Sequence, residues 1–236
     1  MVLDAIFPLS CIGCSRRDVV LCARCAGSVG VVVPPLCERC GRPWPSPLPT
    51  CRDCPPQGID LARSPFLYEG PVAAAIRGIK FGGWRALAPR LAAAIAAVLP
   101  ESLGADAVCW VPLSPRRRRR RGFDQAEVLA RVLADLLDLP AVRALRRRRD
   151  TAAQARLSGS LRRAALVGAF RARGRAPPAV LLVDDVLTTG ATAAACAAAL
   201  REAGADRVVV ATAARAVRGP VPPGTFGGSR PHDPGL

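Results

Sequence analysis

The sequence predicts an α/β protein in which a mostly parallel sheet with flanking helices follows a small cysteine-rich segment. Eight of the ten cysteines fall within residues 11–54, in four CxxC pairs. From about residue 66, short apolar runs alternate with longer amphipathic ones, which is the pattern of parallel strands connected by helices. One apolar run passes directly into two aspartates and a threonine-rich loop, which indicates a ligand site at the carboxyl edge of the sheet.

Composition divides the chain into three parts. Residues 1–60 are rich in Cys, Pro and Gly and show little periodicity, so we expect a separate small domain there. Residues 61–216 carry the α/β pattern, and the Pro- and Gly-rich residues 217–236 predict a disordered tail. The sequence shows no export signal and no apolar run long enough for a membrane span, so we expect a cytoplasmic protein.

The charge of the chain favours phosphorylated or nucleic-acid partners. It carries 34 basic and 18 acidic residues, a formal net charge of +16. Lys80 is the only lysine, so a general preference for arginine accounts for part of this surplus. The only histidine, His232, lies in the predicted tail, which argues against a serine–histidine or cysteine–histidine nucleophile pair.

The α/β pattern can be read element by element. Residues 87–99 predict a helix, and residues 107–111 predict a buried strand. Residues 124–139 predict a second helix, with Asp124 as its cap and Glu127 completing a capping box.

The same pattern continues to residue 214. Residues 179–183 and 207–214 predict two further buried strands. Between them, residues 192–204 predict an Ala-rich helix closed by Gly204.

The four CxxC pairs predict two structural zinc sites. One CxxC turn presents two thiolates to an ion, and a second turn completes a tetrahedral site with Zn–S bonds of about 2.3 Å. Disulfides belong mainly to exported chains, and a redox CxxC explains one pair but not four. The predicted ligands are Cys11, Cys14, Cys22, Cys25, Cys37, Cys40, Cys51 and Cys54.

The pairing of the CxxC turns has two solutions. A sequential arrangement groups the first four cysteines and the last four through short local hairpins, whereas a cross-brace interleaves them; we expect the sequential one. Such a module either staples a segment too small to fold otherwise or binds nucleic acid or protein. Cys109 and Cys196 fall within a predicted strand and helix, so we expect both to be small buried hydrophobic residues.

The stretch VLLVDDVLTTGAT, residues 180–192, is suited to a sugar phosphate. Its loop opens a helix whose free N–H groups and dipole attract a phosphate, aided by threonine hydroxyls and by close approach at Gly190. Asp184 and Asp185 would repel that phosphate, so they must face a sugar diol or a bound metal ion. A ribose 5-phosphate has this polarity.

Competing interpretations of this stretch fit less well. A Walker B strand requires a GxxxxGK[ST] partner, but the only lysine lies in GIKFGG. A dinucleotide fingerprint requires three glycines, and this loop has one. The remaining alternative is an acidic pair at a strand end followed by a capped helix, without a ligand.

VLLVDDVLTTGAT also resembles the PRPP-binding motif of the type I phosphoribosyltransferases. Together with YEGPVAAAIRGIKFGG, WVPLSPRRRRRRGFDQAEVLA and RRRRDTAAQARLSGSLRRAALVGAF behind the cysteines, it resembles the ComF family. These are phosphoribosyltransferase-like proteins linked to competence and DNA uptake in bacteria. The resemblance, from about residue 11 to residue 215, implies a type I phosphoribosyltransferase-like fold behind a double zinc ribbon. It also implies Mg²⁺-dependent PRPP binding, and single-stranded DNA or a competence helicase of the DNA-uptake machinery as partners.

The resemblance also implies roles for individual residues. Residues 149–157 would be a mobile loop over the site. The chain departs from the family at Asp124 and Ala165, where asparagine is usual. The residues expected to bind the ribose and its 5-phosphate are Asp184, Asp185, Thr188, Thr189, Gly190, Ala191 and Thr192. Those expected at the pyrophosphate are Pro112, Leu113, Ser114 and Arg116, with Lys80 added because the chain otherwise uses arginine.

Two functions follow. Some of arginines 116–121 suit a diphosphate, and the remainder, with arginines 146–149, form a DNA-binding stripe unless they are only solvated basic loops. The first hypothesis is a PRPP-binding, phosphoribosyltransferase-like protein acting in DNA uptake. The second is a zinc-ribbon accessory protein that binds single-stranded nucleic acid and uses its sheet as a non-catalytic scaffold or sensor. The sequence shows no residue suited to recognising or deprotonating an acceptor, so it leaves catalysis open.

Overall fold

The structure is a computed structural model in which part of the chain is described. Lys80, Ala165 and the predicted mobile loop at 149–157 lie outside the described residues, as does the tail beyond residue 217. The described residues are 11, 13–17, 19, 21–51, 54, 58–78, 82–148, 166 and 168–217, without the side chains of 82–86 and 120.

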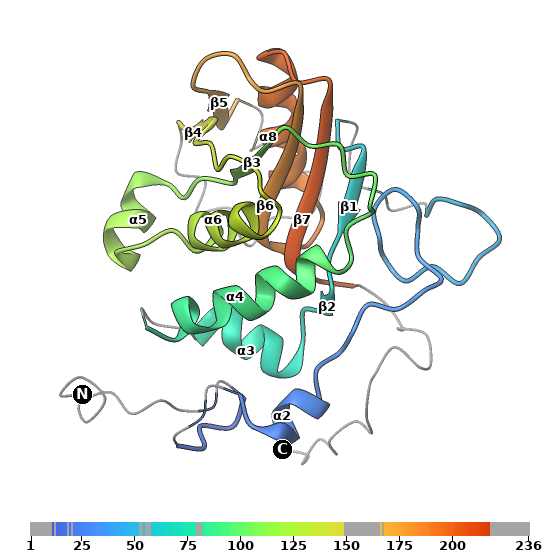
Figure 1. The fold of residues 1–236 in the computed structure, drawn as a ribbon, viewed down its shortest axis with the longest axis vertical. Coiled ribbons are helices and arrows are strands. Elements are labelled where there is room, and N and C mark those ends of the chain that lie inside the picture. Colours follow the sequence, from blue (N-terminus) through green and yellow to red (C-terminus); the bar gives the residue numbers. More distant parts are fainter. Residues whose placement is uncertain are drawn as a thin grey trace.

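One parallel sheet forms the centre of the described structure (Figure 1). Its strand order is β1-β7-β6-β3, and β2 pairs with β7 beyond the end of β1. The longest pairing joins β6 and β7, from Ala179 opposite Arg207 to Leu187 opposite Arg215. The strands are β1 (Leu61–Arg63), β2 (Phe66–Leu67), β3 (Ala107–Trp110), β6 (Ala179–Leu187) and β7 (Arg207–Arg215).

Alternation along the strands divides the core into two apolar layers. Leu182 and Val210 belong to one layer, whereas their neighbours Leu181 and Val209 belong to the other. Successive residues of a strand point to opposite faces, so a strand covered on both sides is apolar throughout. This requirement explains why the apolar runs of the sequence predicted β3, β6 and β7.

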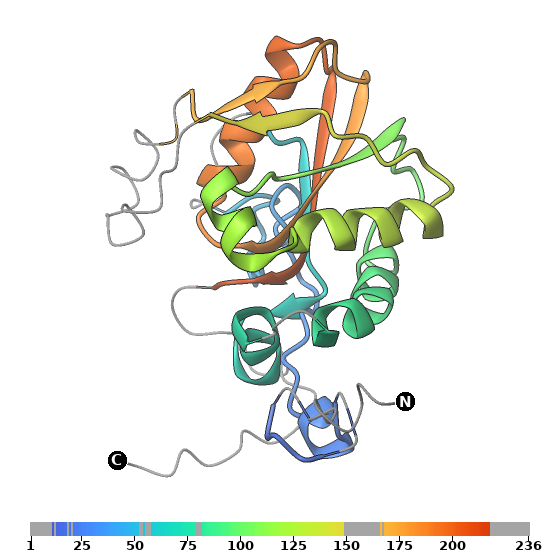
Figure 2. The same cartoon turned by 90° about the vertical axis from the view of Figure 1, so that its left-hand side faces the viewer.

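Helices cover both faces of the sheet (Figure 2). On one face, α8 (Ala191–Glu202) packs with the antiparallel ribbon of β4 (Leu145–Arg147) and β5 (Phe170–Ala172). The other face is covered by α4 (Gly82–Ala96) and α6 (Gln125–Leu136), with α3 (Gly70–Gly78) beside them. The remaining described helices are α2 (Ala23–Gly27) and α5 (Pro115–Arg121).

The expected architecture is the one observed: a parallel sheet with flanking helices, behind a cysteine-rich segment. Cys109 and Cys196 are fully buried, and burial raises the pKa of the Cys109 thiol to about 11. Both cysteines therefore pack as neutral hydrophobic residues, as expected. Among the described residues, no helix has both the length and the hydropathy that crossing a bilayer requires.

Asp124 is the N-cap residue of α6, as predicted, but the predicted capping box does not form. Asp124 stands at the position before α6, but its carboxylate forms no capping hydrogen bond. Its Oδ2 accepts from the Leu113 N–H at 2.9 Å instead, because the loop after β3 brings that donor close. Glu127 likewise pairs with Arg118 and Arg131 rather than closing a capping box.

The arginine run at 116–121 is a helix, not the loop considered above. Ser114 caps α5 by accepting from the Arg117 N–H at 3.3 Å, and Pro115 occupies the first turn, where its missing N–H costs nothing. Gly122 ends the helix with a φ of 76°. The helix predicted at 87–99 is present as α4, but it spans Gly82–Ala96. Pro89 lies inside it, because packing of Ala92 and Ile95 offsets one lost hydrogen bond.

Two leucines three residues apart on α6 test the core assignment. Leu133 is fully buried, whereas Leu136 is 54% exposed. We expect Leu133→Ala to lower the free energy of unfolding by about 2–5 kcal/mol, through lost burial and the cavity left behind. Leu136→Ala should change it by less than about 0.5 kcal/mol. Denaturant unfolding measures both, and equal effects would contradict this packing.

Candidate functional site

A cavity of about 400 Å³ lies at the carboxyl ends of β3 and β6. This is the edge at which parallel α/β sheets bind ligands, because the loops that follow the strands meet there. The predicted residues that line it are Pro112, Leu113, Asp184, Asp185, Thr188 and Thr192. The structure therefore brings together two segments that are about seventy residues apart in the sequence.

Asp184 and Asp185 supply the acidic wall. β6 continues through both residues, and the Asp185 N–H donates to Asp184 Oδ1 at 2.9 Å. Burial and repulsion from Asp185 raise the pKa of Asp184 well above its usual value. Burial also raises the pKa of Asp185, although Arg121 partly opposes this. A cavity that raises two adjacent carboxyl pKa values is suited to a cation or to hydroxyl donors.

The loop between β6 and α8 forms a second wall. Thr188 and Thr192 line the cavity, whereas Thr189, Gly190 and Ala191 shape the loop behind them. Gly190 has a φ of 73°, which a side chain disfavours, and Thr189 Oγ1 accepts from the Ala191 N–H at 3.4 Å. The amino end of α8 thus meets the cavity with two threonine hydroxyls beside it.

Arg117 and Arg121 reach the cavity from α5, and Arg116 does not line it. Arg117 and Arg121 are four residues apart and so share one face of the helix, whereas Arg116 is exposed on another face. Ser114 is fully buried beneath the helix that it caps. The helical phase of the run would have identified this pair, but only once α5 was recognised as a helix.

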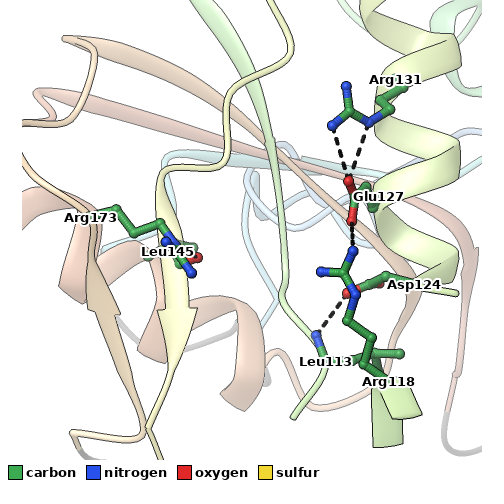
Figure 3. A network of polar contacts seen from close by, with 7 residues as sticks. All are labelled: Leu113, Arg118, Asp124, Glu127, Arg131, Leu145 and Arg173. Carbon is green, nitrogen blue, oxygen red and sulfur yellow. Dashed lines mark hydrogen bonds and ion pairs between the residues drawn. The ribbon is translucent and has the colours of Figure 1, made fainter. Parts of the chain in front are cut away.

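An ion-pair chain holds α5 against α6 (Figure 3). Arg118 Nη2 lies 3.3 Å from Glu127 Oε2, and Arg131 Nη2 lies 3.0 Å from Glu127 Oε1. Figure 3 also shows Asp124 beside this chain, holding the Leu113 N–H. Burial raises the pKa of Asp124, so the cavity has a third carboxyl group.

Four further polar residues line the cavity that the sequence did not single out for it. They are Tyr68, Arg77, Gln125 and Arg147. Arg77 lies 5.8 Å from the Tyr68 ring, and Gln125 Oε1 accepts from Arg121 Nη1 at 2.7 Å. Arg147 lies over the Phe170 ring at 5.2 Å, so the arginine run on β4 contributes one residue to the cavity. In the sequence, only the alternation of side chains along β4 could have distinguished Arg147 from its arginine neighbours as a cavity residue.

The cysteines form the two sequential four-cysteine clusters that were expected. In each cluster, all ligand sulfurs lie within 4.8 Å of one another. Contacts of 3.7 Å between Cys14 and Cys22 and 3.5 Å between Cys40 and Cys51 are close to the edge of about 3.8 Å that Zn–S bonds of about 2.3 Å imply. They are far longer than a disulfide bond of about 2.05 Å.

Backbone N–H groups also favour thiolates in these clusters. Cys51 N donates to Cys37 Sγ at 3.3 Å, and Cys22 N donates to Cys11 Sγ at 3.4 Å. Although burial raises the pKa of Cys37, hydrogen bonds from the backbone N–H groups of Cys40 and Cys51 lower it overall to about 6. The donor set and its geometry fit Zn²⁺, which would be held without an open coordination position.

Fold and sites together define the class: a parallel α/β sheet with a carboxylate-lined cavity at its carboxyl edge, behind two four-cysteine sites. Residues 2–55 match the family model described as double zinc ribbon domain. The chain is 35% identical over 204 residues to the DNA utilization protein YhgH of Salmonella typhimurium, covering 80% of this chain and 88% of that protein.

Two competence proteins are also similar. Competence protein F of Haemophilus influenzae is 31% identical over 232 residues, covering 89% of this chain and 98% of its own. Competence protein ComFC of Streptococcus pneumoniae is 28% identical over 197 residues, with 81% and 86% covered. The chain belongs to the ComF family.

Among solved structures, the glutamine phosphoribosylpyrophosphate amidotransferase from B. subtilis, complexed with ADP and GMP, is similar with a TM-score of 0.37 and 24% identity. The match covers 53% of this chain and 26% of that one. A likeness at this level says nothing about ligand or activity.

The acidic wall should destabilise the ligand-free protein. A carboxyl whose pKa is raised on folding stabilises the fold below its unfolded value near 3.8, and this contribution is lost as the pH rises through the folded pKa. We therefore expect Asp184→Asn/Asp185→Asn to be about 0.5–2 kcal/mol more stable than the parent at pH 7, with the difference shrinking toward pH 4. Thermal unfolding across pH measures this, with exposed Asp135→Asn as control. An advantage that grows in acid would contradict it.

Proposed function

We propose that this protein binds PRPP with Mg²⁺ in the cavity at the carboxyl edge of its sheet and acts in DNA uptake. The observation that carries the proposal is the presence in one cavity of an acidic pair, threonines at a helix amino end, and several arginines. PRPP requires this combination, because it joins a ribose diol to a 5-phosphate and a pyrophosphate. The competence and DNA utilization relatives support the role in DNA uptake.

Each wall then has a part of the ligand to hold. Asp184 and Asp185 accept from the ribose hydroxyls, and the 188–192 loop takes the 5-phosphate. Arg117 and Arg121 take the pyrophosphate beside Pro112 and Leu113, because guanidinium groups bind phosphate oxygens in pairs. Lys80, outside the described residues, remains a predicted member of this group. Mg²⁺ would neutralise charge between the carboxylates and the diphosphate.

The same walls would support ribosyl transfer. Cleavage of the bond between C1 and the pyrophosphate passes through an oxocarbenium-like state, whose positive charge the carboxylates would stabilise. Arginines would hold the leaving pyrophosphate. The acceptor is not identified by the residues in the cavity, so the proposal is for ligand binding, in an enzyme or in a sensor. We also propose that the zinc-ribbon domain ends near residue 60, where β1 begins.

Two pairs of arginines on α5 give a matched test. Arg117 and Arg121 line the cavity, whereas Arg116 and Arg119 are exposed on the same helix. In calorimetric titration with PRPP and Mg²⁺, Arg117→Ala/Arg121→Ala should weaken binding at least about tenfold, because charged hydrogen bonds contribute about 1.5–3 kcal/mol each. Arg116→Ala/Arg119→Ala should bind as the parent does. Lack of binding by the parent protein, or equal losses in the two variants, would reject the proposal.

A second candidate function is binding of single-stranded DNA by the β4–β5 ribbon. Arg146 on β4 lies directly opposite Arg171 on β5, and both are exposed. Like charges in directly opposed positions destabilise a ribbon, and a phosphate backbone beside them would relieve this. Arg148 and Arg173 add two exposed cations close by. The relatives' names, which refer to competence and DNA utilization, fit this surface.

The opposed pair of arginines provides the test of this surface. Arg146→Ser/Arg171→Ser should weaken single-stranded DNA binding and lower the salt slope by about 1.4, because each phosphate contact contributes about 0.7 for a single strand. Arg146→Lys/Arg171→Lys keeps the charge and should retain most of the slope. Fluorescence anisotropy at several salt concentrations measures this. An unchanged slope in the serine variant would exclude the ribbon as the DNA-binding face.

A further inference from the structure

Arg215, the last residue of β7, is a buried cation whose partner belongs to a zinc site. Its side chain is only 4% exposed. Nη1 donates to the Cys40 carbonyl oxygen, and Nη2 donates to Cys40 Sγ at 3.3 Å. No acidic side chain among the described residues forms an ion pair with it. Burying an arginine is costly unless a negative partner is present, and here that partner is the second four-cysteine cluster.

The cluster suits this role when it holds zinc. Four thiolates around one Zn²⁺ leave a net negative charge on the sulfurs, and donors outside the ligand set commonly orient and stabilise such ligands. The guanidinium group contacts both the sulfur and the backbone of Cys40, so it fixes the turn as well as the ligand. Removal of the metal would leave Arg215 without a stable partner.

The backbone of Arg215 leads directly to the ligand cavity. Arg215 is paired with Leu67 of β2 and with Leu187 of β6, so three strands meet at this residue. Its carbonyl oxygen accepts from the Tyr68 N–H at 2.8 Å, and the next residue, Ala216, donates to the Leu187 oxygen at 3.0 Å. Figure 1 shows this end of β7 beside β2.

Two residues of the cavity are therefore connected closely to Arg215. Tyr68, which lines the cavity, is held by the hydrogen bond to Arg215. Thr188, which also lines it, follows Leu187, the residue paired with Arg215. The side chain and backbone of Arg215 thus connect the turn around Cys40, called here the zinc turn, to two walls of the ligand site.

We propose that Arg215 is a positioning residue that couples zinc occupancy of the Cys37, Cys40, Cys51 and Cys54 site to ligand binding in the cavity. The zinc turn fixes the guanidinium group, which fixes the end of β7 and, through it, Tyr68 and the start of the 188–192 loop. The effect on ligand affinity rests on the proposed function, whereas the effect on zinc retention and on local order does not. By linkage, each ligand strengthens the binding of the other by the same factor.

Arg63 provides a matched control on the same zinc turn. Its Nη1 donates to the Glu38 oxygen at 3.0 Å and so docks the turn onto β1. The packing there is close, since a Cβ on Gly41 would lie 2.5 Å from the Ala62 oxygen. No residue of β1 lines the cavity. Arg63 therefore shares the docking role of Arg215 but lacks its connection to the ligand site.

The test compares Arg215→Met with Arg63→Met in the full, zinc-loaded chain. Zinc release to a colorimetric chelator and PRPP–Mg²⁺ titration are measured for the parent and both variants. Arg215→Met should release the second zinc faster and bind PRPP about fivefold or more weakly, within the usual range of coupling between sites. Arg63→Met should keep the parent's PRPP affinity. Equal PRPP affinity in Arg215→Met and the parent would overturn the coupling.

Three further readouts separate the possible failures. PRPP should slow release of the second zinc from the parent but not from Arg215→Met. Hydrogen exchange at the Tyr68 and Ala216 amides should be faster in Arg215→Met than in Arg63→Met, and this difference holds even if PRPP is not the ligand. Unchanged exchange would reject the positioning role. Should Arg215→Met fail to fold, Arg215→Lys keeps the charge but not both contacts, and it should show the same faster exchange.

Discussion

The pairing of β6 with β7 is the constraint on which the rest of the structure depends. Both strands are buried between two apolar layers, so their register cannot slip by one residue without turning every side chain to the wrong layer. That register sets Asp184 opposite Thr212, whose hydroxyl is paired with Ser64 at 2.6 Å, and Leu187 opposite Arg215. The acidic wall and the attachment of the zinc turn are therefore fixed by the same ladder of backbone hydrogen bonds.

Several arginines in and around the site are paired with specific polar or negatively charged groups. Glu127 forms an ion pair with Arg118, and the Gln125 amide oxygen accepts a hydrogen bond from Arg121. Arg215 donates a hydrogen bond to the second four-cysteine cluster. Of the remaining arginines, Arg117 and Arg147 line the cavity and Arg146 and Arg171 are exposed on the ribbon. A net charge of +16 thus says little by itself, whereas the position of each guanidinium group separates structural from ligand-binding roles.

The sequence predicted the features that depend on local patterns. CxxC turns close within a few residues, so the two four-cysteine clusters could be grouped correctly, and the apolar runs of β3, β6 and β7 are read directly from alternation between layers. The strand predicted at 179–183 and the segment after it also placed Asp184, Asp185, Thr188 and Thr192 at the cavity from local pattern alone.

Features that depend on distant partners could not be predicted. β1 and β2 are strands of three and two residues that exist because β7 lies beside them. Asp124 has the sequence of a cap, but the Leu113 N–H competes for its carboxylate.

The α5 helix was missed for a local reason: six adjacent arginines argue against a helix, although its Ser-Pro start and Gly122 stop are both present in the sequence. Arg116 was expected at the pyrophosphate from the family resemblance, whereas the helical phase of α5 brings Arg117 and Arg121 to the cavity.

The opposed arginines on the β4–β5 ribbon have a consequence for the behaviour of the protein at high concentration. Within the part of the chain that the structure describes, this ribbon is a two-stranded sheet separate from the main one. Open strand edges invite strands from other copies, and repeated positive charge on such a ribbon makes that approach unfavourable. Arg146 and Arg171 therefore also protect the protein against edge-to-edge aggregation. Any substitution that removes their charge exchanges some colloidal stability for a more stable ribbon.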